Sequence, residues 1–301
     1  MKGIFLALGI AIALSSAFAQ AEEKPTDFVI LDRDGKIATV DDIADYFINQ
    51  GADVIFFGEK HDSRAAHYLE LQLLKKIAAR IPKLAVAMEM FEVDNQDELD
   101  DYLAGKISEK QFKNSARLWP NYDTDYRPII EFAKAKGIPV IAANIPRRYA
   151  SMVAKGGTDS WKSLPDSEKV YLPKKYTFLN DRYREEFLKT MQGNPMMKMM
   201  GRVNMDNLYH AQCVKDEKMA ESVAEFLKSH PGYKVMFFCG SFHSDYKLGI
   251  AQKLKMRMPN IKIVNISTVP VPKDVKFDPE ALKGELDRAD FVIFTHESSE
   301  E

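Results

Sequence analysis

Short apolar runs alternate with amphipathic stretches along most of the chain. Six runs are rich in apolar or β-favouring residues, and the first of them is apolar throughout, which is typical of a strand buried on both faces. They span residues 54–57, 84–90, 138–144, 233–239, 261–268 and 291–296. Most of the segments between them carry apolar residues every three or four positions, as amphipathic helices do. This alternation predicts an α/β fold, with a mostly parallel central sheet flanked by helices.

Two other stretches depart from the alternation. Residues 28–40 contain two β-rich runs around an Asp-Arg-Asp-Gly turn, which predicts a hairpin at a sheet edge. Residues 150–204 contain no strand-like run and are polar, helical in pattern and interrupted by Gly and Pro. We expect a helical insertion, or lid, over residues 150–204, called the helical segment below.

Polar residues stand at the carboxyl ends of four of the apolar runs. Because the carboxyl ends of parallel strands meet at one edge of a sheet, these side chains are predicted to share a pocket. They are Glu59 and His61, Glu89, Asn144 and Arg147, and His243. Gly58 precedes the first pair and permits a tight turn or a close approach of the backbone.

The helix expected over residues 205–227 contributes to the same pocket. Its apolar stripe passes through Gln212 and Asp216, which places both on the buried side. A buried carboxylate is costly without a partner, so Asp216 either supports the pocket or belongs to a structural network.

The chemistry of this set leaves two alternatives open. Two histidines and two glutamates, namely Glu59, His61, Glu89 and His243, can bind a divalent metal ion or act as acid and base. Arg147 can bind an anionic group through its planar fork, or it can neutralise Glu89.

Composition excludes some functions and suggests a compartment. The formal charge of −2 and the lack of a basic block argue against a nucleic-acid partner.

The N-terminus has a basic residue, an apolar core and small residues up to Ala21, which predicts a secretory signal peptide over residues 1–21. We therefore expect a soluble exported protein, periplasmic in a Gram-negative host, whose residues 22–301 form one domain. Cys213 and Cys239 allow one disulfide or two buried thiols.

Several motifs together resemble the ChaN-like haem-binding uptake proteins. The resemblance spans about residues 50–250 and rests on GEKHD, AMEMF, WPNYDTDYRPIIEFA, PVIAANIPRRYA, AQCVKDEKMA and GSFHSDYKLGI. It implies an α/β domain, haem as cofactor, a role in iron uptake, and partners among periplasmic or outer-membrane uptake components. Two features differ from the family pattern: the leader has no lipid-accepting cysteine, and the bulky Phe242 precedes His243.

The same resemblance suggests that a tyrosine binds the haem iron at a homodimer interface. Tyr183 is the first candidate, because it shares a helical face with Phe187 and Met191 and is flanked by two arginines. Tyr176 is the second. The alternative is that Tyr183 packs the helical segment onto the sheet with its hydroxyl satisfied. His61, His243 and Arg147 are the other residues expected around the cofactor.

The wider superfamily suggests a different function. It includes Tiki-type metalloproteases and is similar to erythromycin esterases, whose G-E-x-H and G-x-x-H elements match residues 58–61 and 240–243. A metal-dependent peptidase or esterase with Glu59, His61, Glu89 and His243 in its catalytic site is therefore the alternative to a binding protein. A third hypothesis is an interaction module whose site is a relic. Since the chain shows no strong nucleophile motif, binding is the predicted principal role.

Overall fold

A seven-stranded sheet runs through the centre of the part of the chain that the computed structural model describes, residues 25–193 and 204–296. The strands are β1 (Phe28–Asp32), β2 (Val54–Glu59), β3 (Leu84–Glu92), β4 (Val140–Asn144), β5 (Lys234–Gly240), β6 (Ile263–Val271) and β7 (Phe291–His296). Their spatial order is β1-β7-β6-β2-β5-β3-β4, and only the β1–β7 pair is antiparallel. The predicted mostly parallel α/β fold is confirmed.

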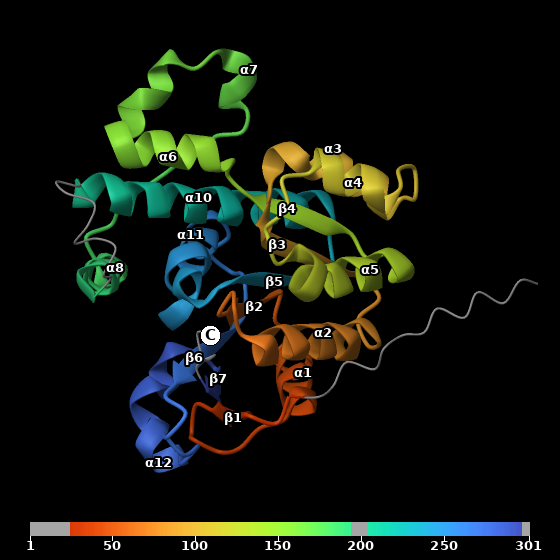
Figure 1. Ribbon diagram of the computed structural model, residues 1–301, viewed down its shortest axis with the longest axis vertical. Coiled ribbons are helices and arrows are strands. Elements are labelled where there is room, and N and C mark those ends of the chain that lie inside the picture. Colours follow the sequence, from red (N-terminus) through yellow and green to blue (C-terminus); the bar gives the residue numbers. More distant parts are fainter. Residues whose placement is uncertain (1–24, 194–203, 297–301) are drawn as a thin grey trace, which may run out of the picture.

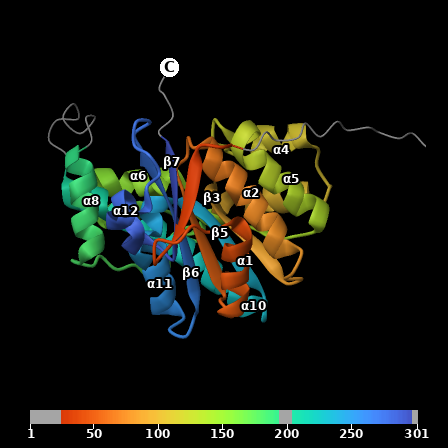
Figure 2. The same cartoon turned by 90° about the horizontal axis from the view of Figure 1, so that it is seen from below.

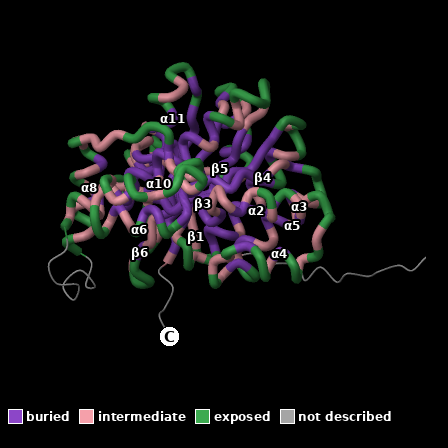
Figure 3. The backbone as a smooth tube through the Cα atoms, turned by 90° about the horizontal axis from the view of Figure 1, so that it is seen from above, coloured by how far each residue is buried: buried purple, intermediate pink, exposed green. Residues whose placement is uncertain are grey.

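Helices cover both faces of this sheet (Figures 1 and 2). On one face lie α1 (Val40–Asn49), α2 (Arg64–Ala78), α3 (Gln96–Leu103), α4 (Glu109–Ser115) and α5 (Arg127–Lys136). The other face packs against α10 (Met205–Ser229) and α11 (Gly249–Arg257). Around this core are α6 (Arg147–Gly156), α7 (Asp166–Lys169), α8 (Arg182–Gly193) and α12 (Pro279–Leu282). Buried residues are concentrated in the strands and on the helix sides that face them (Figure 3).

The strand order opens a crevice at the carboxyl ends of β2 and β5. The helices that follow these neighbouring strands lie on opposite faces of the sheet. Helix α2, which follows β2, packs on one face, and α11, which follows β5, packs on the other. Ligands of parallel α/β sheets bind at such a switch point, just beyond the strand ends. Glu59 pairs in register with Gly240 there, so the residues that follow both strands emerge at the same height.

Several boundaries differ from the sequence prediction. The predicted hairpin is reduced to a single bridge between Leu31 and Ile37, because β1 pairs instead with β7 and forms the sheet edge. Strand β3 continues past Glu89 to Glu92, with a register shift against β4. Residues 241–243 and 245–247 form two short 3₁₀ turns between β5 and α11, so α11 starts only at Gly249.

The described part of the helical segment contains helices and no strand, as predicted. Cys213 and Cys239 are both free and buried. No helix of residues 25–193 and 204–296 is long and apolar enough to cross a bilayer. The predicted signal peptide and the methionine-rich residues 196–200 lie outside the described residues.

Gly58 confirms the expected close approach of two backbones. A Cβ atom at this position would lie 2.8 Å from the Cα of Ser241 and 2.9 Å from the carbonyl oxygen of Ile266. Gly58→Ala is therefore expected to lower the free energy of unfolding by about 2–3 kcal/mol, since overpacking a rigid backbone forces it to shift. Urea denaturation measures this loss, and Gly284→Ala, where nothing lies within 4 Å, is the matched control. Equal stability of the two variants would contradict the prediction.

Candidate functional site

One pocket of about 710 Å³ lies at the carboxyl edge of the sheet. Its volume is within the range of small-molecule and cofactor sites, about 300–1,000 Å³. It brings together most of the predicted site residues, which come from four strand ends and α10. These are Glu59, His61, Glu89, Asn144, Arg147, Gln212 and His243. Apolar side chains complete the wall, including Trp119, Phe187, Met191 and Phe242.

His243 is held between two buried carboxylates. Its Nδ1 atom lies 2.6 Å from Oδ1 of Asp216, and its Nε2 atom lies 3.2 Å from Oε1 of Glu89. Glu89 also accepts a hydrogen bond from the backbone N–H of Gly240, at 2.8 Å. Asn144 donates to the backbone carbonyl of Glu89 at 3.1 Å, which connects β4 with β3 beside the pocket. Asp216 thus contacts His243 from α10 and also accepts a hydrogen bond from Tyr183, so both sequence hypotheses for this carboxylate stay open.

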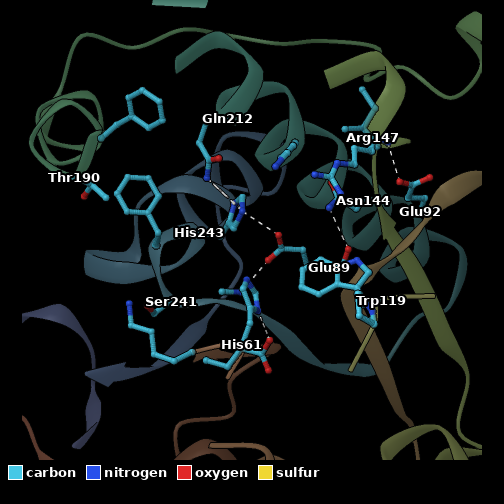
Figure 4. Close-up of a pocket in the computed structure, with 18 of the residues that line it drawn as sticks. His61, Glu89, Glu92, Trp119, Asn144, Arg147, Thr190, Gln212, Ser241 and His243 are labelled. Carbon is cyan, nitrogen blue, oxygen red and sulfur yellow. Dashed lines mark hydrogen bonds and ion pairs between the residues drawn. The ribbon is translucent and has the colours of Figure 1, made fainter. Parts of the chain in front are cut away.

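Glu59 and His61 form a second pair across the pocket. The Nδ1 atom of His61 lies 2.6 Å from Oε1 of Glu59, and the ring packs edge-on against Trp119 with centroids 4.9 Å apart. His61, Glu89 and His243 point toward one another in the pocket (Figure 4). Glu89 thus lies between the two histidines, and each histidine has its own buried carboxylate partner.

The charges of this group shift its pKa values strongly. Burial opposes the charged form of His243, but Glu89 and Asp216 outweigh it and raise the imidazole pKa to about 10. Burial likewise opposes ionisation of Glu89, but the charge of His243 and its hydrogen bond lower the carboxyl pKa to about 2. Strongly perturbed groups that converge on a pocket are typical of functional sites.

His243 is accordingly expected to stay protonated well above neutral pH. Its folded pKa of about 10 exceeds the unfolded value of about 6.5. Its stabilising contribution is therefore complete below about pH 6.5 and is lost as the pH rises through about 10. Nitrogen-15 NMR of the imidazole, assigned with His243→Gln, measures the titration directly. A midpoint near pH 6.5 would contradict the ion-pair arrangement.

Cations line the pocket beside this cluster. Lys60, Arg147 and Lys215 all face it, and among the described residues none of their side chains forms an ion pair. Arg147 does not neutralise Glu89, whose ion pair is with His243. The backbone N–H of Arg147 donates to Glu92 at 2.9 Å, which holds the start of α6 at the pocket (Figure 4). Unpaired cations beside apolar walls favour a ligand that has an apolar body and anionic groups.

Comparison with known proteins identifies the family. The model of a family described as haem-binding uptake, Tiki superfamily, ChaN matches residues 49–254. The chain belongs to this ChaN family. The predicted resemblance, and its link to haem binding, are confirmed at the level of the family.

Solved structures agree with the fold of the ChaN family. A ChaN of Campylobacter jejuni, with cofacially bound haem, is 20% identical, covers 91% of this chain and 99% of its own, and has a TM-score of 0.61. An erythromycin esterase mutant in its open conformation is 11% identical, covers 90% of this chain and 83% of its own, and has a TM-score of 0.50. At these identities the likeness shows the fold alone.

A curated relative matches over a shorter stretch. The chloroplastic protein RETICULATA-RELATED 5 of Arabidopsis thaliana is 25% identical over 130 residues, which are 40% of this chain. The matched part is 17% of that plant protein's length.

The candidate tyrosines of this ChaN-family chain lie outside the large pocket. Tyr183 is 2% exposed and its hydroxyl donates to Oδ2 of Asp216 at 2.6 Å. Burial and the charge of Asp216 raise the pKa of this phenol well above its usual value. Tyr176 is 40% exposed and packs against Trp161 and Phe178. In this arrangement, therefore, the hydroxyl of Tyr183 is satisfied, and iron ligation by a tyrosine stays a prediction.

The four side chains predicted as metal ligands form two pairs, Glu59 with His61 and Glu89 with His243. Across the described residues, a closer group of possible metal ligands is Glu59, His67 and Glu70, whose ligand atoms lie within 4.8 Å of one another. Sequence reasoning missed His67 and Glu70. Their spacing of three residues on a predicted helix was the available signal, because such residues lie side by side. It also missed Lys215, which lies three residues after Gln212 on α10 and therefore on the same side of that helix.

Proposed function

We propose that this ChaN-family chain is an exported haem-binding protein of haem or iron uptake, in which a tyrosine of the helical segment binds the iron. The observation that carries the proposal is the pocket, where apolar side chains lie beside cations that form no ion pair with any described residue, in a chain of a haem-binding family. Haem has the matching chemistry, a flat apolar ring with two carboxylate groups.

The residues present fit this group. Trp119, Phe187 and Phe242 offer apolar surface, and Arg147 and Lys215 offer charge-assisted hydrogen bonds to carboxylates. Phe187 and Met191 belong to α8, so the helix that carries Tyr183 also forms a wall of the pocket. We further propose that two copies of the chain form the homodimer suggested by the family resemblance, and that periplasmic or outer-membrane uptake components deliver or receive the haem.

Arg147→Ala is expected to weaken haem affinity about tenfold, the loss of about 1.4 kcal/mol from one partly exposed charged contact. Absorbance titration with ferric haem measures the dissociation constant. Arg80→Ala is the matched control. Arg80 follows α2, forms an ion pair with Asp45 of α1 and does not line the pocket. Equal affinity of both variants and the parent would remove Arg147 from the binding site.

One observation favours hydrolysis as a second candidate function. His61 and His243 face one pocket, and each has a buried carboxylate partner, as a histidine acting in acid–base catalysis often has. Under this hypothesis Glu59, His61, Glu89 and His243 form the catalytic site. Purified protein that cleaves a peptide or an ester with added metal, and loses this activity with His61→Ala, would establish the hydrolase. A lack of turnover over a panel of such substrates would leave binding as the function.

A further inference from the structure

A compact group of three buried side chains lies behind the wall of the pocket. Glu59 ends β2, while His67 and Glu70 lie three residues apart on the buried side of α2. Their exposed fractions are 1%, 7% and 0%. Of the three, only Glu59 also lines the pocket. The group is therefore separate from the pair formed by Glu89 and His243.

The spacing of the donor atoms suits a single metal ion. The Nδ1 atom of His67 lies 3.2 Å from Oε2 of Glu59 and 3.0 Å from Oε2 of Glu70. Two ligands of one ion at about 2.1 Å, with bond angles between octahedral and tetrahedral values, lie about 3.0–3.4 Å apart. Rearrangement of the backbone is therefore not needed for all three side chains to reach one ion.

The far side of the His67 ring also has the arrangement of a metal ligand. Its Nε2 atom lies 3.2 Å from the carbonyl oxygen of His61 and 3.6 Å from Oδ2 of Asp125. Metal-binding histidines usually donate their second ring N–H to a carbonyl or carboxylate, which directs the other nitrogen to the ion. The hydroxyl of Tyr126 donates to Oε1 of Glu59 at 2.8 Å and orients that carboxylate as well.

Two oxygens of the group have no contact with hydrogen-bond geometry, although Nδ1 of His67 lies 3.2 Å from one of them. Oε2 of Glu59 and Oε1 of Glu70 are fully buried and accept no hydrogen bond. Both carboxylates face the single Nδ1 atom of His67, so either a proton on this nitrogen or a metal ion must lie between them, because each carboxylate is otherwise desolvated and repelled by the other. An ion at the centre of the group supplies both the charge and the missing ligation.

We propose that Glu59, His67 and Glu70 bind one divalent transition-metal ion of the Zn²⁺ type. One imidazole and two carboxylates are a donor set that such ions accept, and water can complete the coordination. The ion fixes Glu59 and thereby the position of His61 at the pocket wall. This site shares Glu59 with the predicted strand-end set but does not use His61, Glu89 or His243. It does not depend on haem binding.

Zinc titration of the chelator-treated full-length protein tests the proposal, in the absence of haem. We expect one Zn²⁺ per chain by calorimetry, and a Co²⁺ complex with the weak visible bands of nitrogen and oxygen ligands. Glu70→Gln and His67→Ala are each expected to weaken binding about 100-fold or more, since even residues that only support a ligand contribute about 10–100-fold. His230→Ala, at the exposed end of α10, is the matched control and should bind as the parent does.

Two results would overturn the proposal. The first is an unsubstituted protein that binds neither Zn²⁺ nor Co²⁺ stoichiometrically, in which case a proton on His67 holds the two carboxylates together. This result does not require any variant to fold. The second is metal binding that survives Glu70→Gln and is lost with His243→Ala, which would place the ion at the strand-end pair. Thermal melting of each variant distinguishes a lost ligand from a lost fold.

Discussion

Asp216→Ala is expected to lower the free energy of unfolding by about 3–5 kcal/mol, the largest stability loss that the site predicts. Asp216 is fully buried and accepts from both the hydroxyl of Tyr183 and the Nδ1 atom of His243, each at 2.6 Å. Its removal leaves a buried imidazolium with one carboxylate instead of two, and a buried phenol without an acceptor. Urea denaturation monitored by circular dichroism measures the loss.

The matched control is Glu225→Ala on the same helix. Glu225 pairs with Lys174 at the surface, where such pairs contribute about 0–1 kcal/mol. A loss for Asp216→Ala no larger than that of the control would show that the Tyr183–Asp216–His243 connection does not stabilise the fold. A smaller loss at high pH than at neutral pH is expected, because His243 then loses its charge as the pH rises through about 10.

Tyr183→Phe is expected to abolish the absorbance bands of a tyrosinate bound to ferric haem. Ligation requires α8 to turn so that the hydroxyl leaves Asp216 and reaches the pocket that Phe187 and Met191 line. Only Tyr183 and Phe187 of α8 are buried, and its ion pairs with Asp287 and Asp206 are at the surface. Because exposed ion pairs contribute only about 0–1 kcal/mol each, breaking them adds little to the free-energy cost of this movement.

Tyr176→Phe is the matched control for this substitution. Tyr176 is exposed and lies outside the pocket, so its loss should leave the spectrum unchanged. The Tyr183→Phe variant keeps the aromatic ring and loses the two hydrogen bonds of the hydroxyl, one to Asp216 and one from Gln212. At about 1 kcal/mol each, this loss allows the fold to persist. An unchanged spectrum with Tyr183→Phe would assign Tyr183 a structural role, and loss of the bands with Tyr176→Phe would move the ligand to Tyr176.

The convergence of the pocket residues was predictable from the sequence because parallel strands impose it. Once residues 54–57 and 233–239 are assigned to parallel strands, Glu59 and His243 must emerge at one edge of the sheet. The burial of Asp216 followed in the same way from the helical spacing on α10, with Met219 and Val223 on its buried side. Local periodicity determines these positions without further tertiary information.

Other features depend on contacts between distant segments, which periodicity does not contain. The partner of β1 is β7, more than 250 residues away in the chain, so the local turn gave the wrong pairing. The direction of the Tyr183 ring depends on how α8 packs against α10. The same holds for His67 and Glu70, because a polar side chain on α2 becomes a partner of Glu59 only through the crossover between β2 and β3.

The central claim is that the pocket of this ChaN-family chain binds haem. Absorbance titration of the purified protein with ferric haem, in parallel with a Thr190→Trp variant that fills the pocket from α8, tests it most directly. The account predicts saturable binding at a fixed haem-to-chain ratio for the parent protein and strongly weakened binding for the variant. A parent spectrum that remains that of free haem at every ratio, or equal binding by both proteins, would contradict it.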